Sequence, residues 1–502
     1  MENKACNEVV TVANMPMTVF DMISAMQNKY ADRVAFRYVE GKDTVVEKTY
    51  AQYVQDIRKA TGYLQQELGE PKGKKIVILS RTNYEYGAVV FGTMMAGAVI
   101  VTLNQGKSWA ELEYELGMVE PDLIFNDGID YGCRAQLEAL YGARLRPMDA
   151  WTAAPEAEMV NRIDHEGLLM LMFTSGTTGR SKGVMLSEKN YFTACQMYID
   201  GLKSVLDHEE RLVPQYLDQT FSHFTLVPMF HLAGFICYFV YGVQGWTLNL
   251  CCDARDLRRD MSLMHSDAMS TPPVLVEMIC NEVKRGHADR LNGLWNLSCS
   301  SAILDPAILS DLVKNGFYIN QCYSMTELAG YGLLNVTQEG DHLRALGKPD
   351  GFCEVKVDET GEICVRGGCV MLGYYKDPEA TVETIDKDGW LHTGDLARVD
   401  EEGYYYMTGR KKNLIILDSG ENVSPEELEK LLGKCDAIKE CIVKEMGKKI
   451  GTVVCCEDDK QQQVKAFVTE LNRTLPMYKR ISVVECSAEP LPRNALGKLL
   501  RK

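Results

Sequence analysis

Short apolar segments alternate with amphipathic segments of helical length along the first two thirds of the chain. Turn residues bound the apolar segments, which we expect to be strands: Ile76–Leu79, Ala98–Val101, Leu123–Phe125, Leu168–Phe173 and Phe224–Val227. Strands that alternate with helices are typical of parallel sheets covered by helices. The pattern therefore predicts an α/β fold.

Two uncharged segments, Tyr86–Leu103 and Leu226–Cys252, are long enough to cross a bilayer. Glycines interrupt both, however, and Pro228 interrupts the second. We interpret each as a buried helix followed by a buried strand, the strands being Ala98–Val101 and Trp246–Leu250, and expect no membrane span.

The pattern changes from about Gly347 onward. Close-spaced Gly and Asp turns separate four strand-like segments, which are Glu354–Val357, Glu362–Val365, Ala397–Val399 and Tyr404–Met407. Such spacing favours a small β-barrel subdomain, at about residues 330–411.

The polar segment Thr408–Asn413 is the best candidate for a domain boundary. Soon after it, Ser424 and Pro425 form a helix-start signal, with Ser as N-cap and Pro at the first helical position. We therefore expect an N-terminal domain at residues 1–411 and a small C-terminal α+β domain at residues 412–502.

Composition excludes some classes of function. The chain has 502 residues, 46% of them apolar, and a formal charge of −16, which argues against a nucleic-acid binder because such proteins need a broad positive field. The 17 cysteines show no metal-site spacing and no disulfide framework. Free thiols and the absence of a signal-like N-terminus favour the cytoplasm.

A glycine- and hydroxyl-rich segment, Phe173–Gly183, directly follows one apolar run. Backbone N–H groups and hydroxyls of such a loop can surround phosphate oxygens, and Lys182 adds positive charge. Ser181 stands where a Walker loop has its second glycine, so the segment is a different kind of phosphate loop.

Six further motifs follow in chain order: Pro228–Gly234, Gln321–Glu327, Gly361–Gly367, Gly389–Leu396, Gly409–Lys412 and Pro492–Lys498. With these seven motifs the chain resembles the adenylate-forming superfamily, and within it the acyl- and aryl-CoA synthetases. The resemblance implies a large N-terminal domain of helix-covered β-sheets, a small mobile C-terminal domain and an active site between them. It also implies ATP and Mg²⁺ as cofactors and CoA as a co-substrate.

The resemblance assigns most of the ATP site. The phosphate loop would comprise Thr174, Ser175, Gly176, Thr177, Thr178, Gly179 and Lys182, and the turn beside the adenine would comprise Ser300, Ser301 and Ala302. Tyr323 would stack on adenine beside Ser324, and Thr326 would reach the α-phosphate. Glu327 would hold the metal, Asp395 the ribose hydroxyls, and Arg410 ribose or phosphate.

Two lysines belong to the mobile domain in this resemblance. Lys498 would reach the carboxylate and the α-phosphate in the first half-reaction, and Lys412 stands at the hinge position. The family reorients its C-terminal domain between adenylation and thioester formation.

His231 and Ser324 are the candidate acyl-pocket residues. Phe230-His231 matches the CoA-synthetase form of its motif, and no partner for a substrate ammonium is visible, which favours a simple carboxylic acid. His231 has an alternative role as a structural core histidine. Ser324 replaces the glycine of the family pattern and should narrow the tunnel, so short-chain, medium-chain or aryl acids are favoured over long ones.

Two alternatives stay open at this point. A stand-alone adenylation enzyme could load the phosphopantetheine thiol of a carrier protein, and a non-catalytic homologue could only bind nucleotide. The latter should have lost Lys498, Asp395 or Glu327, and all three are present. The expected partners are a small carboxylate, ATP and CoA, with a carrier protein and a homodimer left open.

Overall fold

A computed structural model of the protein describes residues 10–175, 181–206, 220–299, 304, 306–338, 340–416, 422–447, 449–493 and 499–500. The chain divides into two compact units. The first comprises Met1–Val355 and Val365–Leu391, and the second comprises Lys356–Cys364 and His392–Lys502.

One sheet of the first unit has seven strands in the order β17-β8-β7-β4-β3-β5-β6. These strands are β3 Lys75–Leu79, β4 Val99–Thr102, β5 Leu123–Asn126, β6 Leu145–Pro147, β7 Met170–Ser175, β8 Ser181–Leu186 and β17 Gly373–Tyr374. Strands β7, β4, β3, β5 and β6 are parallel, whereas β8 is antiparallel to both β7 and β17. The strands β3 and β4 are almost wholly buried because helices cover them.

The other large sheet has eight strands in the order β14-β13-β12-β11-β9-β10-β1-β2. They are β1 Val34–Glu40, β2 Thr44–Thr49, β9 Ser222–Thr225, β10 Thr247–Leu250, β11 Ala268–Thr271, β12 Asn296–Cys299, β13 Tyr318–Met325 and β14 Gly330–Asn335. Its six inner strands, from β13 to β1, run parallel to their neighbours. The two outer strands are antiparallel.

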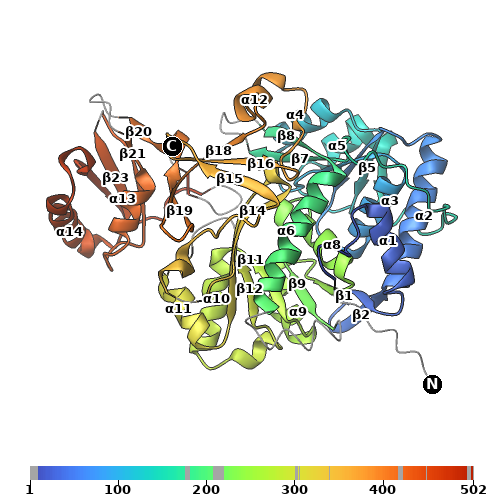
Figure 1. The fold of residues 1–502 in the computed structure, drawn as a ribbon, viewed down its shortest axis with the longest axis horizontal. Helices are drawn as coiled ribbons and strands as arrows, with labels where there is room; N and C mark the ends of the chain where they lie inside the picture. The colour runs from blue at the N-terminus through green and yellow to red at the C-terminus, as the bar shows by residue number, and fades with distance from the viewer. Residues whose placement is uncertain are drawn as a thin grey trace. The chain divides into compact units, whose positions relative to one another are not determined.

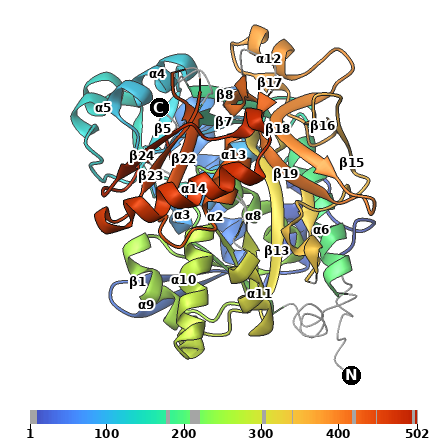
Figure 2. The same cartoon turned by 90° about the vertical axis from the view of Figure 1, so that its left-hand side faces the viewer.

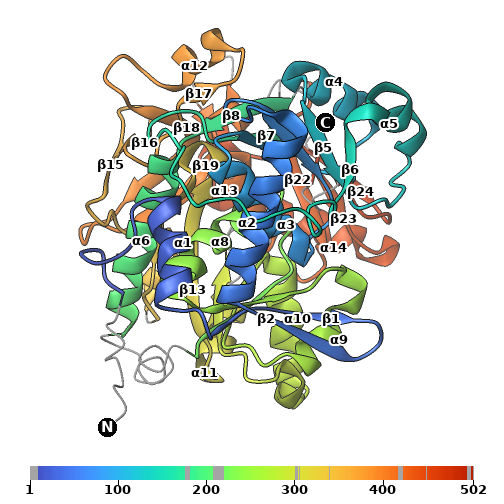
Figure 3. The same cartoon turned by 90° about the vertical axis from the view of Figure 1, so that its right-hand side faces the viewer.

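Helices form the layer between these sheets (Figures 1 and 3). They are α1 Val19–Asn28, α2 Tyr50–Leu68, α3 Tyr84–Met95, α6 Glu188–Leu206 and α8 Leu232–Gln244. Aromatic rings join them, since Tyr191 of α6 stacks on Phe239 of α8 at 4.7 Å between centroids. Helices α3 and α8 are buried on nearly every residue, as expected for helices enclosed on all sides.

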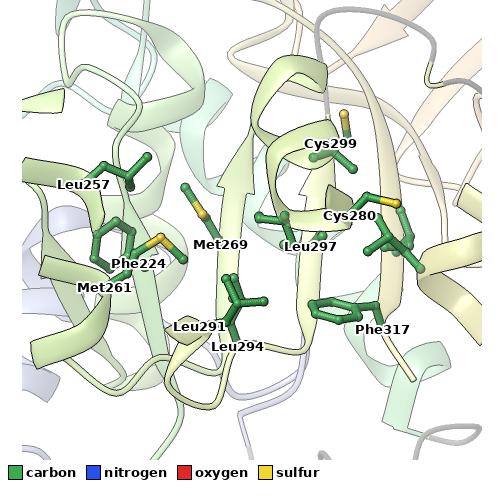
Figure 4. Close-up of a cluster of buried hydrophobic side chains, with 14 of the residues drawn as sticks. Phe224, Leu257, Met261, Met269, Cys280, Leu291, Leu294, Leu297, Cys299 and Phe317 are labelled. Carbon is green, nitrogen blue, oxygen red and sulfur yellow. The ribbon is translucent and has the colours of Figure 1, made fainter. Parts of the chain in front are cut away.

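Other helices cover the outer faces. Helices α4 Trp109–Val119 and α5 Arg134–Tyr141 pack on the seven-stranded sheet. On the eight-stranded sheet, α9 Leu257–Leu263, α10 Pro273–Lys284 and α11 Pro306–Lys314 enclose a core around Met269 and Leu297 (Figure 4). The expected parallel sheets covered by helices are confirmed.

The two long uncharged segments form α3 with β4 and α8 with β10, as expected from their glycines. Within the described part of the chain, no helix combines the length and the apolarity needed to cross a bilayer.

The expected small β subdomain is present as an open four-stranded sheet, in the order β15-β16-β18-β19. The strands are β15 Cys353–Val357, β16 Glu362–Gly367, β18 Leu391–Val399 and β19 Tyr405–Arg410, and helix α12 spans Pro378–Thr384. Strands β18 and β19 form an antiparallel pair in which Asp395 is the partner of Arg410.

The end of the chain forms an α+β arrangement within the second unit (Figure 2). Helices α13 Pro425–Leu432 and α14 Gln461–Thr474 pack on a sheet of β22 Glu440–Glu445, β23 Ile450–Cys455 and β24 Val483–Ser487, and β20 Ile415–Ile416 pairs with β21 Asn422–Val423. Ser424 caps α13 by accepting a hydrogen bond from Glu427 N, as expected. The predicted boundary at residues 411 and 412 lies inside the second unit. It stays a prediction.

Candidate active site

The glycine- and hydroxyl-rich segment joins two antiparallel strands. Strand β7 extends to Ser175 and β8 begins at Ser181, so that Thr174 pairs with Lys182. The strand thus continues two residues farther than the apolar run predicts, because its last residues pair with β8. The loop residues Gly176, Thr177, Thr178 and Gly179 lie outside the described residues.

Tyr374 connects two of the predicted site residues. Its hydroxyl donates a hydrogen bond to Glu327 Oε1 at 2.9 Å. The Lys182 ammonium lies over the same ring, 4.6 Å from its centroid, a cation–π distance. Burial first and the Glu327 charge second raise the pKa of Tyr374, so the phenol keeps the proton it donates.

Sequence reasoning missed Tyr374. It lies 47 residues from Glu327 along the chain. It reaches the site because β17 pairs with β8, the strand that carries Lys182. The one signal in the sequence is the Gly373-Tyr374-Tyr375 turn after a short apolar run, which on its own indicates no role.

Glu327 fits the predicted metal role by its chemistry. It lies in the 3-10 turn Thr326–Leu328 directly after β13, and its backbone carbonyl accepts a hydrogen bond from Met371 N at 2.9 Å. The backbone is therefore fixed at the residue whose carboxylate is the candidate ligand. Carboxylate oxygens are the ligands that Mg²⁺ prefers.

Tyr323 and Ser324 lie near the carboxyl end of β13. Tyr323 is buried, and Gly332 of β14 lies against its ring, where a Cβ would come within 3.1 Å of Cδ1. The glycine thus leaves room for the ring that the sequence predicts beside adenine. The turn residues Ser300, Ser301 and Ala302 lie outside the described residues.

A pocket that is partly open to solvent adjoins Ser324. The ends of β11, β12 and β13 line it with Ser270, Ser298, Cys322 and Ser324. Leu232, Ala233 and Ile236 of α8 and Gly330 complete the lining. None of these eight described residues is charged. Ligands of α/β proteins bind at the carboxyl ends of parallel strands, so this is the candidate acyl pocket.

His231 is the N-cap of α8. Its Nδ1 accepts a hydrogen bond from Ala233 N at 3.2 Å, which requires a neutral ring with an unprotonated Nδ1. The structure places it at the start of the helix that lines the pocket, next to Leu232. A role as an acyl gate stays a prediction.

His223 of β9 supports the same pocket from behind. Its Nε2 accepts a hydrogen bond from Ser270 N at 3.2 Å, and Tyr241 OH lies 2.7 Å from its Nδ1. Complete burial lowers the pKa of His223 to about 3, so the ring is neutral. His223 lies in none of the seven sequence motifs.

Asp395 and Arg410 meet in the second unit. Arg410 Nε lies 2.9 Å from Asp395 Oδ1, where Asp395 is buried and Arg410 is half-exposed. The Asp395 N–H donates to Thr393 Oγ1 at 3.1 Å, which fixes the backbone of the motif. Lys412 follows in a 3-10 turn, where burial first and Arg410 second lower its pKa.

Metal-type donors of Asp358, Glu362, Cys364 and His392 lie within 4.8 Å of one another in the same unit. Glu362 already accepts from Lys411 Nζ and from Gly394 N, both at 2.8 Å. Because a cation is paired with this carboxylate, we interpret the cluster as a network that fixes the Asp395 turn. Lys498 lies outside the described residues.

The chain matches a known enzyme family and curated relatives over most of its length. The model of the family AMP-binding enzyme matches residues 24–375. The chain is 27% identical to peroxisomal OPC-8:0-CoA ligase 1 of Arabidopsis thaliana, over 87% of this chain and 84% of that protein. It is 26% identical to a long-chain-fatty-acid–CoA ligase of Escherichia coli O157:H7, over 97% and 93%.

Solved structures share the fold. O-succinylbenzoate CoA synthetase of Bacillus subtilis, in complex with its acyl-adenylate intermediate, superposes with a TM-score of 0.81 at 23% identity, over 96% of both chains. The anthranilate CoA ligase AuaEII, in complex with anthranoyl-AMP, gives a TM-score of 0.79 at 20% identity, over 98% of this chain and 97% of the other.

The family model covers more than half of the chain, and the matched span contains the Lys182, Tyr374 and Glu327 arrangement together with the pocket. The resemblance inferred from the seven motifs is thereby confirmed: the chain belongs to the AMP-binding enzyme family.

Proposed function

We propose that this protein activates a carboxylic acid with ATP to an acyl-adenylate and then transfers the acyl group to the thiol of CoA. The family match and the CoA ligases among its relatives support an ATP-dependent, AMP-forming CoA ligase. One observation carries the proposal at the level of residues: Tyr374 contacts both Lys182 and Glu327. Glu327 in turn follows Ser324, which lines the pocket, by three residues.

Adenylation brings two anions together. A carboxylate oxygen attacks the α-phosphorus, and the bond to the bridging oxygen breaks, so that pyrophosphate leaves. Positive charge must therefore be present where the negative charge builds up. In the second half-reaction the CoA sulfur attacks the acyl carbon, and AMP leaves with the bonding electrons.

The residues of the first unit have complementary roles in this proposal. Thr174 and Lys182 bind the departing phosphates, and Tyr374 keeps the Lys182 ammonium and the Glu327 carboxylate in place. Tyr323 stacks on adenine, and Thr326 contacts the α-phosphate. Mg²⁺ held by Glu327 would neutralise phosphate charge.

In the second unit, Asp395 accepts hydrogen bonds from the ribose hydroxyls, because a carboxylate has two acceptor oxygens. Arg410, paired with Asp395 in the structure, contributes a permanently charged fork toward ribose or phosphate. Lys498 acts in adenylation, and Lys412 serves as the hinge. These four roles rest on the resemblance at the motif positions.

We propose a short-chain, medium-chain or aryl acid as substrate. Ser324 lines the pocket where the family pattern has glycine, so its hydroxymethyl group occupies room that a long chain would need. Uncharged lining favours simple acids over amino acids, since a buried ammonium needs a counter-charge. A carrier-protein thiol remains the alternative acceptor, because phosphopantetheine ends in the same thiol as CoA.

We also propose a cytoplasmic location and a soluble enzyme acting on small molecules. All described cysteines are free, and most are buried. Unpaired thiols persist best in a reducing compartment.

The test is a panel of carboxylates assayed for pyrophosphate release, each with and without CoA. We expect release with short, medium or aryl acids and CoA-dependent formation of a thioester. A palmitate optimum would contradict the substrate class, and Ser324→Gly should shift preference toward larger acids. Activity that needs a carrier protein instead of CoA would favour the alternative acceptor.

A further inference from the structure

Two serines form a polar patch in the candidate acyl pocket. Ser270 and Ser298 are register partners on the parallel strands β11 and β12. Side chains of register partners point to the same face of a sheet, and neighbouring strands lie about 5 Å apart. Both serines are half-buried and line the pocket, whereas α8 lines it with Leu232 and Ile236. The pocket thus combines a polar wall with an aliphatic one.

The serine pair lies away from the reacting end. Ser298 lies beside Cys322, and Ser324 follows two residues later on β13. At the usual rise per residue of a strand, this separation is about 7 Å. The Ser324 end continues into Thr326 and Glu327, where the proposed adenylation takes place. The serine pair therefore faces the part of a bound acid that is remote from its carboxylate.

The hydrogen-bonding capacity of Ser270 and Ser298 limits which chemical groups of a bound acid can contact them. A thiol adjoins each of the two hydroxyls, Cys237 beside Ser270 and Cys322 beside Ser298, and a thiol is a weak hydrogen-bonding group. An alkyl chain laid over the serines would remove water without replacing its hydrogen bonds, which is unfavourable. A charged group would find no counter-charge among the described lining residues.

We propose that Ser270 and Ser298 recognise a neutral hydroxyl or oxo group at the end of the acid remote from its carboxylate; this inference rests on the proposed ligase function. The substrate class is a compact hydroxy- or oxo-substituted carboxylic acid, and aryl and short alkyl acids can both present such a group.

The experiment measures pyrophosphate release and thioester formation with matched acids that differ by one hydroxyl. One pair is 4-hydroxybenzoate with benzoate, a second is 3-(4-hydroxyphenyl)propanoate with 3-phenylpropanoate, and a third is 8-hydroxyoctanoate with octanoate. We expect the hydroxylated member of at least one pair to have a kcat/KM about tenfold higher. The pair with the largest ratio of kcat/KM shows whether the preferred hydroxy acid is aryl or alkyl.

Two variants test the residues. Ser298→Ala and Ser270→Ala should each reduce the ratio of kcat/KM between the hydroxylated and the unsubstituted acid to near one. The reason is that each variant should raise turnover of the unsubstituted acid relative to the hydroxylated acid. Ser262→Ala, at an exposed position of α9, is the matched control and should keep the wild-type ratio. The wild-type ratios stand as an independent measurement if a variant fails to fold.

The outcomes separate this inference from the proposed function. Equal turnover within every pair, or a hydroxyl preference that survives both substitutions, overturns the recognition role while leaving adenylation intact. Pyrophosphate release with none of the acids, including controls of other chain lengths, overturns the ligase function and this inference with it.

Discussion

Arg410 Nε lies 2.9 Å from Asp395 Oδ1, and the two residues are register partners on β18 and β19. The antiparallel pairing alone brings these two motif residues together, although 15 positions separate them in the chain. Because Asp395 is buried and Arg410 is half-exposed, the pair presents a carboxylate oxygen and a cationic fork at one place. A nucleotide ribose and phosphate require those two kinds of group.

We expect Asp395→Asn to raise the KM for ATP by about tenfold, because hydrogen bonds to a charged acceptor are stronger than those to an amide. Arg410→Lys should have a smaller effect in the same direction, since it keeps the charge but loses the fork. Steady-state kinetics with varied ATP measure both. Asp388→Asn, on an exposed turn, is the control. An unchanged KM with reduced thermal stability would show that Asp395 serves only the ion pair.

Tyr374 offers a substitution that separates two contacts. Tyr374→Phe removes the hydrogen bond to Glu327 but keeps the ring beneath Lys182. We expect the Mg²⁺ concentration for half-maximal pyrophosphate release to rise several-fold, because the candidate ligand loses its positioning partner, as happens when outer-shell hydrogen bonds are removed. Tyr374→Leu should in addition raise the KM for ATP.

Tyr375→Phe is the matched control, one residue farther along the chain. It should leave the Mg²⁺ dependence as in the wild type. If Tyr374→Phe behaves like this control, the hydroxyl is not needed to position Glu327.

The pair Asp395–Arg410 and the pair Tyr374–Glu327 differ in how far the sequence predicts them. The sequence identifies Asp395, Arg410 and Glu327 because each lies in a motif with a family pattern. It also predicts α8 and β10, because apolar residues and glycines mark a buried helix and a buried strand. The sequence does not identify Tyr374 and His223, because their hydrogen-bond partners, Glu327 and Ser270, each lie 47 residues away along the chain. Contacts of that kind depend on strand order, which local periodicity does not encode.

Local rules also failed in one detail of the phosphate hairpin. Glycine and hydroxyl residues favour a loop from Phe173 onward, yet β7 continues to Ser175 because pairing with β8 satisfies its backbone. Conversely, Ser424 and Pro425 predicted the start of α13 correctly, since capping depends only on neighbouring residues.

Lys498→Ala tests the proposed catalytic lysine through the two half-reactions. We expect acyl-dependent ATP/pyrophosphate exchange to fall by about two to three orders of magnitude, the effect of losing one group that stabilises transition-state charge. Conversion of supplied acyl-AMP and CoA to thioester should be retained. Lys502→Ala is the control near the same end of the chain, and exchange at the wild-type rate in Lys498→Ala would remove the role.

Lys412→Pro tests the hinge. Proline restricts φ, so a change of backbone conformation at this residue becomes costly. We expect adenylation to be spared more than thioester formation, with exchange and single-turnover thioester assays compared in one preparation. Lys412→Ala keeps the backbone freedom and should retain both half-reactions. An equal loss of both activities in Lys412→Pro would place the hinge elsewhere.

His223 should make the first unit sensitive to acid. Its folded-state pKa of about 3 lies below the ordinary 6.5, so between these values the unfolded chain binds the extra proton. Stability is therefore complete above pH 6.5 and declines as the pH falls toward 3. For this single group, the loss at pH 5 is about 2 kcal/mol.

Urea unfolding at several pH values measures this slope, and His223→Gln isolates the contribution of the imidazole. Glutamine can accept the Ser270 N–H bond without titrating, so the variant should be less stable at pH 7.5 but should lose less stability between pH 6.5 and pH 5. If His223→Gln keeps the wild-type slope, the acid sensitivity arises from other groups, and the neutral ring behind Ser270 serves packing alone.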